Sequence, residues 1–261
     1  MMKPMELILT RKSVRTFDGR PLTEEDKEKL SKYISAIKNP YGIPVEFVLL
    51  DAKEYGLSSP VIQGEHLYVA AKVQKTKHSE EAYGYSFEQL VLYAWSLGIG
   101  TTWIAGTMDR ELFEKAAQVK ENELMPAVSP LGYSSEEKSA VDRKPRDSVH
   151  GDNRFPASEL FFENDFSTPL QTEDEILEAV RWAPTAANMQ PARVVKAGNK
   201  YHLYEKHRAT YNPDALWDVQ KIDLGIALCH LMCVTGGECE IADPGIAVPE
   251  GTEYIATVTV K

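Results

Sequence analysis

The chain repeats one plan of secondary structure in its two halves, and this repeat limits the folds open to it more than any single motif does. Each half opens on a predicted helix start, Pro21–Asp26 or Pro169–Glu175, where a threonine precedes acidic residues. A proline then introduces a β-rich run in each half, Pro44–Leu50 or Pro191–Val195. The alternative is a chance likeness of two helix–strand–helix segments within one large domain.

Each half also contains a strongly apolar helix that ends at glycine. Residues 87–97 precede Gly98, and residues 222–234 precede Gly236. Apolar side chains on most faces indicate that both helices are buried. We therefore expect an α+β fold with a mixed sheet flanked by helices in each half. The predicted parts are residues 1–133, a connecting arm over residues 134–166, and residues 167–261.

The connecting arm is rich in charge and shows little apolar periodicity. It nevertheless contains large apolar residues that could anchor it, namely Phe155, Leu160, Phe161, Phe162 and Phe166. We expect an extended arm that wraps across the other half of the chain. A solvated linker is the alternative.

Charge and composition argue against several classes of partner. The 261 residues carry a net charge of −10, which opposes binding to nucleic acid or to an anionic membrane. No apolar run approaches the roughly 20 residues of a membrane-spanning helix. The three cysteines, Cys229, Cys233 and Cys239, do not make the even set of a disulfide framework, so a reducing cytoplasm is the expected compartment.

A basic cluster stands out in this acidic chain. Arg11, Lys12, Ser13 and Arg15 place three cations and a hydroxyl within five residues. Guanidinium groups and a serine hydroxyl can bind a terminal phosphate through charge-assisted hydrogen bonds. A phosphate contact is therefore one interpretation of this cluster, and a solvated basic turn is the other.

A second polar motif follows the first predicted helix of the second half. Pro184 is expected to end the helix over Glu175–Trp182 and to fix the turn behind it. Thr185, Asn188 and Gln190 then offer polar side chains to a ligand. A plain loop at the end of a helix is the alternative.

Both motifs resemble parts of the flavin site of the FMN-dependent nitroreductase family. Arg11–Phe17 is similar to the opening of these proteins, and Ala183–Pro191 is similar to a second flavin motif, with Thr185 in place of the more usual serine. Leu97–Gly106 resembles the stretch whose backbone amides approach flavin N5, and Ser129–Tyr133 with the basic residues that follow resembles the last strand and its phosphate contact. The resemblance implies that FMN is bound by Arg11, Lys12, Ser13, Arg15, Trp103, Ile104, Ala105, Gly106, Arg143, Lys144, Pro184, Thr185, Ala186, Asn188 and Gln190.

The two halves lack complementary parts of this pattern. Residues 33–44 contain no Pro-Ser-x-x-Asn motif, and residues 162–166 contain no Arg-x-Ser-x-Arg motif. The motifs that remain can build one site and not two. The chain is thus similar to the tandem subgroup of nitroreductase-like proteins. This likeness implies a nitroreductase-like fold arranged as an intramolecular pseudo-dimer, with one FMN per chain, and a monomer is expected.

The resemblance implies an FMN-dependent oxidoreductase that uses NAD(P)H as a transient electron donor. Hydride would pass from the nicotinamide to flavin N5, and a small organic acceptor such as a nitroaromatic, a quinone, an enone or a flavin would then take two electrons in a ping-pong cycle. No side chain is assigned a catalytic role. The alternatives are a divergent reaction such as dehalogenation or flavin fragmentation, a non-catalytic flavin-binding or sensing protein, and a structural relic without flavin.

One further cluster has a spacing that could suit a metal ion. Cys229, His230 and Cys233 lie within one helical turn. Cysteine is also common in apolar cores, and the sequence offers no evident fourth ligand. A buried structural role is therefore expected for these residues, and no metal site is predicted.

Overall fold

The computed structural model describes residues 2–137, 139–171, 174–209 and 211–261, and the chain divides into two compact units. Unit 1 contains Thr10–Ser79 and Gln89–Gly151, and unit 2 contains Lys3–Leu9, Glu80–Glu88 and Asp152–Lys261. The chain therefore passes from one unit to the other several times. Each unit has its own sheet.

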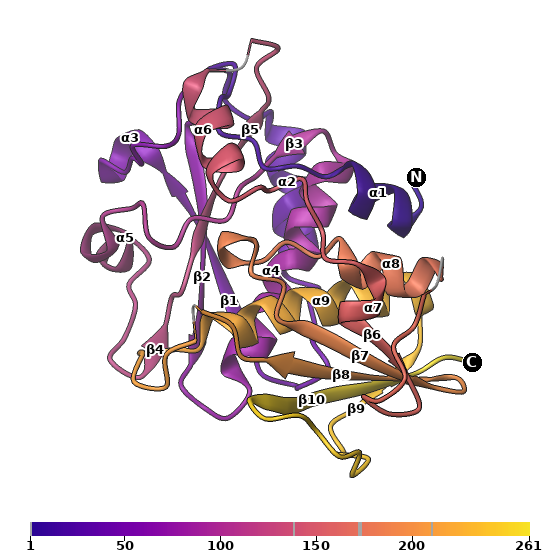
Figure 1. Ribbon diagram of the computed structural model, residues 1–261. Coiled ribbons are helices and arrows are strands. Elements are labelled where there is room, and N and C mark those ends of the chain that lie inside the picture. The colour runs from indigo at the N-terminus through magenta and orange to yellow at the C-terminus, as the bar shows by residue number, and fades with distance from the viewer. Residues whose placement is uncertain (1, 138, 172–173, 210) are drawn as a thin grey trace. The chain divides into compact units, whose positions relative to one another are not determined.

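Unit 1 is built on one antiparallel sheet. Its helices and strands are α2 (Glu24–Ile34), β1 (Val45–Asp51), α3 (Ala52–Tyr55), β2 (Leu67–Gln74), the second half of α4 (Ser79–Ser96), β3 (Ile99–Gly100), α5 (Arg110–Ala116), β4 (Glu123–Leu124), β5 (Val128–Tyr133) and α6 (Ala140–Ser148). The strand order is β1-β2-β5-β3, and β4 also pairs with β2 (Figure 1). β2 is buried from Tyr68 to Val73, and Phe113 of α5 packs edge-on against Tyr68 with ring centroids 5.0 Å apart. The core of unit 1 therefore lies where α5 packs on β2.

The start of α2 confirms the helix start predicted at Pro21–Asp26. Thr23 Oγ1 accepts a hydrogen bond from the backbone N of Asp26 at 3.2 Å, which is the contact of a capping threonine. In a full capping box the acidic side chain would return to the backbone N of the threonine. Here the Tyr133 hydroxyl joins the two residues, because it donates to Asp26 Oδ2 at 2.5 Å and accepts from Thr23 N at 3.3 Å.

Unit 2 contains a mixed sheet. Its elements are α1 (Pro4–Thr10) up to Leu9, the first half of α4, α7 (Ala157–Leu160), β6 (Phe161–Glu163), α8 (Glu175–Arg181), the 3-10 helix η1 (Ala186–Asn188), β7 (Ala192–Ala197), β8 (Lys200–Lys206), α9 (Val219–Thr235), β9 (Glu238–Glu240) and β10 (Thr252–Thr259). The strand order is β6-β7-β8-β10-β9. β6 runs parallel to β7, and the other pairs are antiparallel.

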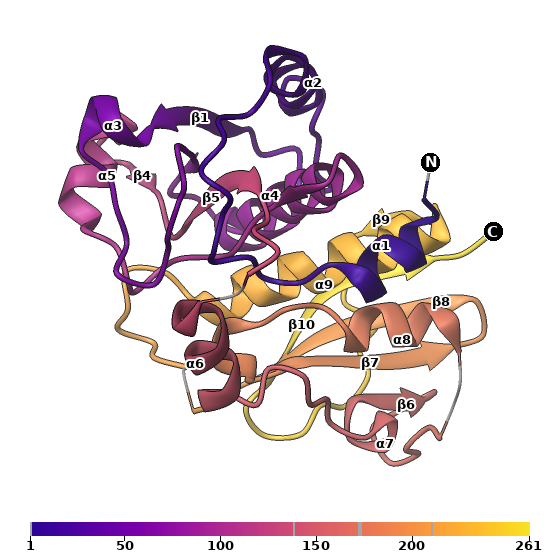
Figure 2. The same ribbon diagram turned by 90° about the horizontal axis from the view of Figure 1, so that it is seen from above.

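The apolar helix α9 is the centre of unit 2. Asp218 caps its start by accepting from the backbone N of Gln220 at 2.8 Å, and Gly236 ends it with a φ of 56°, a left-handed conformation that glycine adopts without strain. α9 contacts β7, β8 and β10, and α8 runs beside it (Figure 2). Its residues from Ile222 to Leu231 are all buried, as the sequence predicts.

Two glycines allow α9 and the first half of α4 to cross with their backbones in contact. A Cβ atom added at Gly84 would lie 2.0 Å from the carbonyl oxygen of Ile222. A Cβ atom added at Gly225 would lie 2.2 Å from the carbonyl oxygen of Glu81. Such distances are far below van der Waals contact, so each position of this crossing requires glycine.

The structure confirms the predicted α+β fold and corrects the conformation of the connecting arm. The arm is not extended throughout: Ser139 Oγ accepts from Val141 N at 3.3 Å and caps α6, a helix that a charged sequence with few apolar residues did not suggest. Two of its predicted anchors, Leu160 and Phe161, are buried in unit 2. Of the second predicted helix start, Thr172 and Glu173 lie outside the described residues, and Asp174 caps α8 through Ile176 N at 2.9 Å. Among the described residues, no helix combines the length and the apolar character needed to cross a membrane.

Candidate functional site

The basic segment enters unit 1 directly after α1. Val14 is buried, and a Cβ added at Gly100 would lie 2.8 Å from the Cβ of Val14, so this side chain fills the space that Gly100 leaves. Ser13 and Thr16 form isolated β-bridges, which is the geometry of an extended chain. Because side chains alternate along an extended chain, Ser13 and Arg15 lie on the face opposite Val14. Both are half-buried, as is Arg11, whereas Lys12 is exposed.

The Thr101–Gly106 segment is attached to this basic segment. Ser13 bridges Thr101, and Val14 N donates to Thr101 O at 2.8 Å. Ile104 is buried in the core, and its backbone N and O are both hydrogen-bonded to Val128 at 2.9 Å. Ala105 and Gly106 are exposed, and a Cβ added at Gly106 would meet no atom within 4 Å. Of the residues predicted to present backbone amides to flavin, Ala105 and Gly106 therefore have accessible backbone, and Ile104 does not.

α6 brings the third predicted segment of unit 1 to the same place. Asp142 Oδ1 accepts from Arg15 N at 2.9 Å, and its second oxygen accepts from the Thr16 hydroxyl. Thr16 Oγ1 also lies 2.9 Å from Ser139 Oγ. Arg143 and Lys144 follow in this helix, and their side chains lie outside the described part of the structure. Unit 1 thus brings together the backbones of three segments that the sequence assigns to one cofactor.

We expect Asp142→Ala to loosen α6 from the basic segment. The substitution leaves the Arg15 amide and the Thr16 hydroxyl without their acceptor, which costs about 1–3 kcal/mol for buried groups. Limited proteolysis should show faster cleavage within residues 134–151, and urea unfolding should show lower stability. Asp147→Ala, on the exposed part of the same helix, is the matched control and should leave both measurements unchanged. Equal behaviour of the two variants would contradict the role given to Asp142.

The second polar motif forms a strained loop in unit 2. α8 ends at Arg181, before Pro184, as the sequence predicts. Ala187, Asn188 and Gln190 then have φ values of 49°, 55° and 51°. Non-glycine residues seldom adopt this left-handed conformation, and three of them within four residues indicate that the surrounding contacts impose it.

A buried carboxyl group supplies part of that constraint. Both oxygens of Asp223, on α9, lie 3.1 Å from the backbone N of Ala186 and accept its hydrogen bond. Asp223 is 4% exposed, and burial raises its pKa well above the usual value for an aspartate. Thr185 Oγ1 accepts from Gln190 N at 3.0 Å and closes the loop from within. Asp223 of α9 thus fixes the position of the loop Thr185–Gln190, called the motif loop below.

The other polar side chains of the loop bind the chain segment before α7. Asn188 Nδ2 donates to Asn153 O at 3.1 Å, and Gln190 Oε1 accepts from Phe155 N at 2.8 Å. The Arg154 guanidinium between them lies 4.7 Å from the ring centre of Trp182, a cation–π contact. The connecting arm therefore meets the predicted flavin motif through residues 153–155.

Sequence reasoning missed the residues that position these segments. Asp142, Asp223 and Arg110 each bind backbone groups of these segments; the Arg110 guanidinium donates to Ala105 O at 3.0 Å and to Met125 O at 2.7 Å. Only Asp223 gave a readable signal, because an acidic residue in the middle of an otherwise apolar helix needs a buried partner. The predicted burial of the cysteine cluster is confirmed for Cys229 and His230, and the two imidazole nitrogens of His230 lie 3.0 Å from Ala179 O and 3.1 Å from Glu88 Oε1.

Comparison with known proteins identifies the family. A family model described as "Putative TM nitroreductase" matches residues 3–235. The chain belongs to this nitroreductase family. A curated relative from Archaeoglobus fulgidus, named "Putative NADH dehydrogenase/NAD(P)H nitroreductase", is 28% identical over 169 residues, which cover 56% of this chain and 95% of the relative.

A solved structure of a nitroreductase shows the same fold. A nitroreductase from Thermotoga maritima aligns over 99% of this chain and 94% of its own, with 22% identity and a TM-score of 0.64. A chain from Clostridium difficile, described as an "FMN-dependent Nitroreductase", aligns over 57% of this chain and 96% of its own, with 19% identity and a TM-score of 0.44. The family match confirms the predicted resemblance to nitroreductases, and it makes this nitroreductase-family protein an oxidoreductase.

Proposed function

We propose that this nitroreductase-family protein is an FMN-dependent NAD(P)H oxidoreductase that reduces a small organic acceptor by two electrons. The observation that carries the proposal is the joining of the basic segment, the Thr101–Gly106 segment and α6 within unit 1. Ser13 bridges Thr101, and Arg15 N is bound to Asp142. A phosphate-binding group and an accessible backbone stretch are thereby held by one set of hydrogen bonds. The name of the Archaeoglobus relative supports the choice of a nicotinamide donor.

The residues of unit 1 fit a flavin phosphate and a flavin edge. The half-buried Arg11, Ser13 and Arg15 are suited to a dianionic phosphate, because a partly desolvated guanidinium binds it more strongly than an exposed lysine does. Arg143 and Lys144 are proposed to add to this group. At the other end of the segment, the open space beside Gly106 leaves its backbone accessible to a planar ring.

The residues of unit 2 fit the polar chain of the flavin. Pro184, Thr185, Ala186, Asn188 and Gln190 are proposed as its contacts, carried by the strained loop that Asp223 holds. Thr185 uses its oxygen as an acceptor within the loop, so its hydroxyl proton can be donated to a ligand. When bound, FMN supplies the hydride-accepting ring, and the protein's part is to bind and orient it.

The proposal includes one FMN per chain in a fused, tandem arrangement. The complementary motifs support it, since each unit carries only part of the flavin pattern. The lengths support it too: 95% of the Archaeoglobus relative aligns with 56% of this chain. A protein that carries both sets of residues in one chain needs no partner to complete the site, so we propose that it acts as a monomer.

The test is an absorbance spectrum of the purified protein with added FMN, followed by anaerobic addition of NADH or NADPH. One FMN per chain that is bleached by the nucleotide is the expected result. One FMN that resists bleaching would indicate a flavin-binding protein without this donor. Two FMN per chain would contradict the single site, and none would contradict the cofactor.

Arg11→Ala is expected to weaken FMN binding about 10- to 100-fold, because a lost hydrogen bond to a charged group costs about 1.5–3 kcal/mol. Asn188→Ala is expected to weaken it about 2- to 10-fold, because a lost hydrogen bond to the uncharged polar chain costs about 0.5–1.5 kcal/mol. Fluorescence titration of FMN measures the affinity. Lys53→Ala removes an exposed positive charge elsewhere in unit 1 and should bind FMN like the wild type. Lys12→Ala should lose less affinity than Arg11→Ala, since Lys12 is exposed. Unchanged FMN affinity in both Arg11→Ala and Asn188→Ala would contradict the proposed site.

A further inference from the structure

A buried glutamate in unit 2 lacks the partners that such a group requires. Glu205, on β8, is 0% exposed, and among the described residues neither of its carboxylate oxygens has a hydrogen-bond partner. Burying an uncompensated carboxylate is unfavourable, and burial raises the pKa of Glu205 to about 8. Buried polar groups without hydrogen bonds are rare in native proteins, so Glu205 calls for an explanation.

The strand register places a second carboxylate directly opposite. Glu253 of β10 is the cross-strand partner of Glu205. Directly opposed side chains of an antiparallel strand pair lie on the same face of the sheet. Two carboxylates in this arrangement repel one another. Lys221 of α9 lies 3.5 Å from Glu253 through its Nζ, and thus compensates the outer carboxylate of the pair. Lys221 acts on Glu205, the inner carboxylate, only at longer range, so a further cation could bind there.

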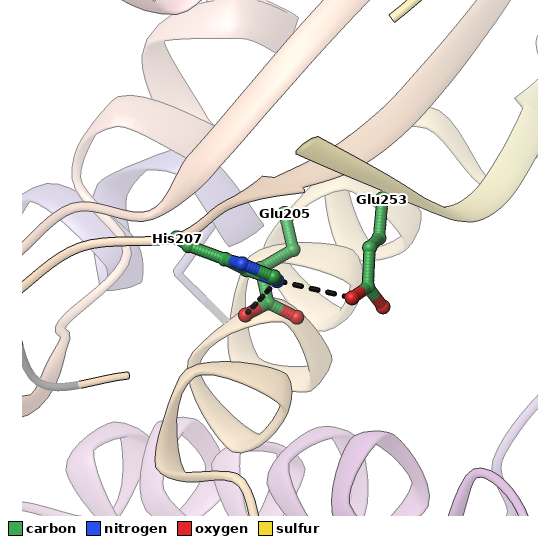
Figure 3. A group of neighbouring side chains, drawn as sticks. All are labelled: Glu205, His207 and Glu253. Carbon is green, nitrogen blue, oxygen red and sulfur yellow. Dashed lines mark hydrogen bonds and ion pairs between the residues drawn. The ribbon is translucent and has the colours of Figure 1, made fainter. Parts of the chain in front are cut away.

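An imidazole completes the cluster (Figure 3). His207 follows β8, two residues beyond Glu205, and its Nε2 lies 3.1 Å from Glu253 Oε1 and 3.8 Å from Glu205 Oε1. Its ring stacks on Tyr211 with centroids 3.6 Å apart and planes 9° apart, which fixes the direction of Nε2. One ligand atom from each of Glu205, His207 and Glu253 lies within 4.8 Å of the other two. Three potential ligand atoms therefore converge, one from β8, one from the residue just after β8, and one from β10.

We propose that Glu205, His207 and Glu253 bind a divalent transition-metal ion of the zinc type. Two carboxylates balance the charge of the ion, and zinc is bound by Glu oxygen and His nitrogen at about 2.0–2.2 Å, most often with four ligands. Bonds of that length separate ligand atoms by about 3.3 Å in a tetrahedron, close to the spacing already present around His207 Nε2. The imidazole ligand argues against Ca²⁺ and Mg²⁺, because both ions prefer a set of oxygen ligands only.

The site adjoins the motif loop in the fold of unit 2. Glu205 pairs with Ala192 across β7 and β8, and Lys206 N donates to Pro191 O at 2.8 Å, directly after the loop that ends at Gln190. A metal ion here would tie β8 to β10 behind that loop. No residue of this metal site is among those proposed to bind FMN. The proposed role of the ion is therefore structural.

The test is a titration of the chelator-treated, dialysed protein with Zn²⁺, followed by isothermal calorimetry and by thermal unfolding. We expect one tightly bound Zn²⁺ per chain and a higher melting temperature with the ion. Loss of an outer-shell partner already weakens metal binding about 10- to 100-fold, so His207→Gln and Glu253→Gln should each weaken it by about 100-fold or more. Glu250→Gln, an exposed loop carboxylate near β10, is the matched control and should bind like the wild type.

Co²⁺ in place of Zn²⁺ separates this site from the cysteines. Binding through Glu and His gives only d–d absorption, whereas binding to Cys233 or Cys239 gives a thiolate charge-transfer band. Glu253 is partly exposed, so Glu253→Gln is expected to fold even if a substitution at the buried Glu205 does not. Equal Zn²⁺ affinity in the wild type, His207→Gln and Glu253→Gln, a thiolate band with Co²⁺, or no saturable binding would each overturn the proposal.

Discussion

Gly225→Ala is expected to destabilise the protein by more than about 3 kcal/mol, the upper end of the cost of ordinary overpacking. The added Cβ would lie 2.2 Å from Glu81 O and 2.8 Å from Tyr85 N. These are backbone atoms of α4, so no side chain can rotate to relieve the clash. The two helices would have to separate, and α9 would lose packing along its buried length.

Urea unfolding followed by circular dichroism measures this loss, and Gly84→Ala should behave in the same way, since its Cβ would lie 2.0 Å from Ile222 O. Gly106→Ala is the control for stability alone: its Cβ meets open space, and surface changes of this kind usually stay within about 0.5 kcal/mol. Wild-type stability in Gly225→Ala would show that the helices do not cross at these glycines.

Asp223→Ala is expected to release the motif loop and to lower both stability and FMN affinity. The Ala186 amide would lose its only described acceptor, at a cost of about 1–3 kcal/mol for a buried donor. Three residues of the loop have left-handed backbone conformations, which non-glycine residues seldom keep without surrounding contacts that impose them. Part of that strain would then be relaxed by a change of loop shape, which removes the pre-organised contacts for the ligand.

Asp223→Asn separates the role of the acceptor from that of the charge. Burial raises the pKa of Asp223 well above its usual value, which favours the uncharged form of the group, and asparagine is uncharged, has nearly the same shape and keeps one acceptor oxygen. We expect the asparagine variant to bind FMN within a few-fold of the wild type by fluorescence titration. If the asparagine variant lost as much affinity as the alanine variant, the negative charge and not the hydrogen bond would be the feature that matters.

The elements that the sequence predicted well are those in which one local rule dominates. Pro184 ends α8, Gly236 ends α9, and the apolar run from Ile222 makes α9 a buried helix. The family resemblance also followed from short motifs, which the match over residues 3–235 confirms. In each case neighbours in sequence carry the information.

The features that escaped prediction depend on partners far apart in the chain. α6 has few apolar residues, and it is held by Asp142 against Arg15 and Thr16, more than a hundred residues earlier. Glu205 and His207 belong to no recognisable sequence motif, and only the strand register places Glu253 beside them. The predicted polar contacts of Asn188 and Gln190 with a ligand could not reveal that the same side chains also bind residues 153 and 155.

The repeated passage of the chain between the units has a consequence for how such a protein could be divided. Glu80–Glu88 belongs to unit 2 although it is encoded amid the segments of unit 1. A gene fragment that stopped at Gly151 would carry Gly84 away from Gly225, and the remaining fragment would expose the α9 surface that the first half of α4 covers. The two units of this chain are therefore not exchangeable modules, because no single cut in the sequence separates them.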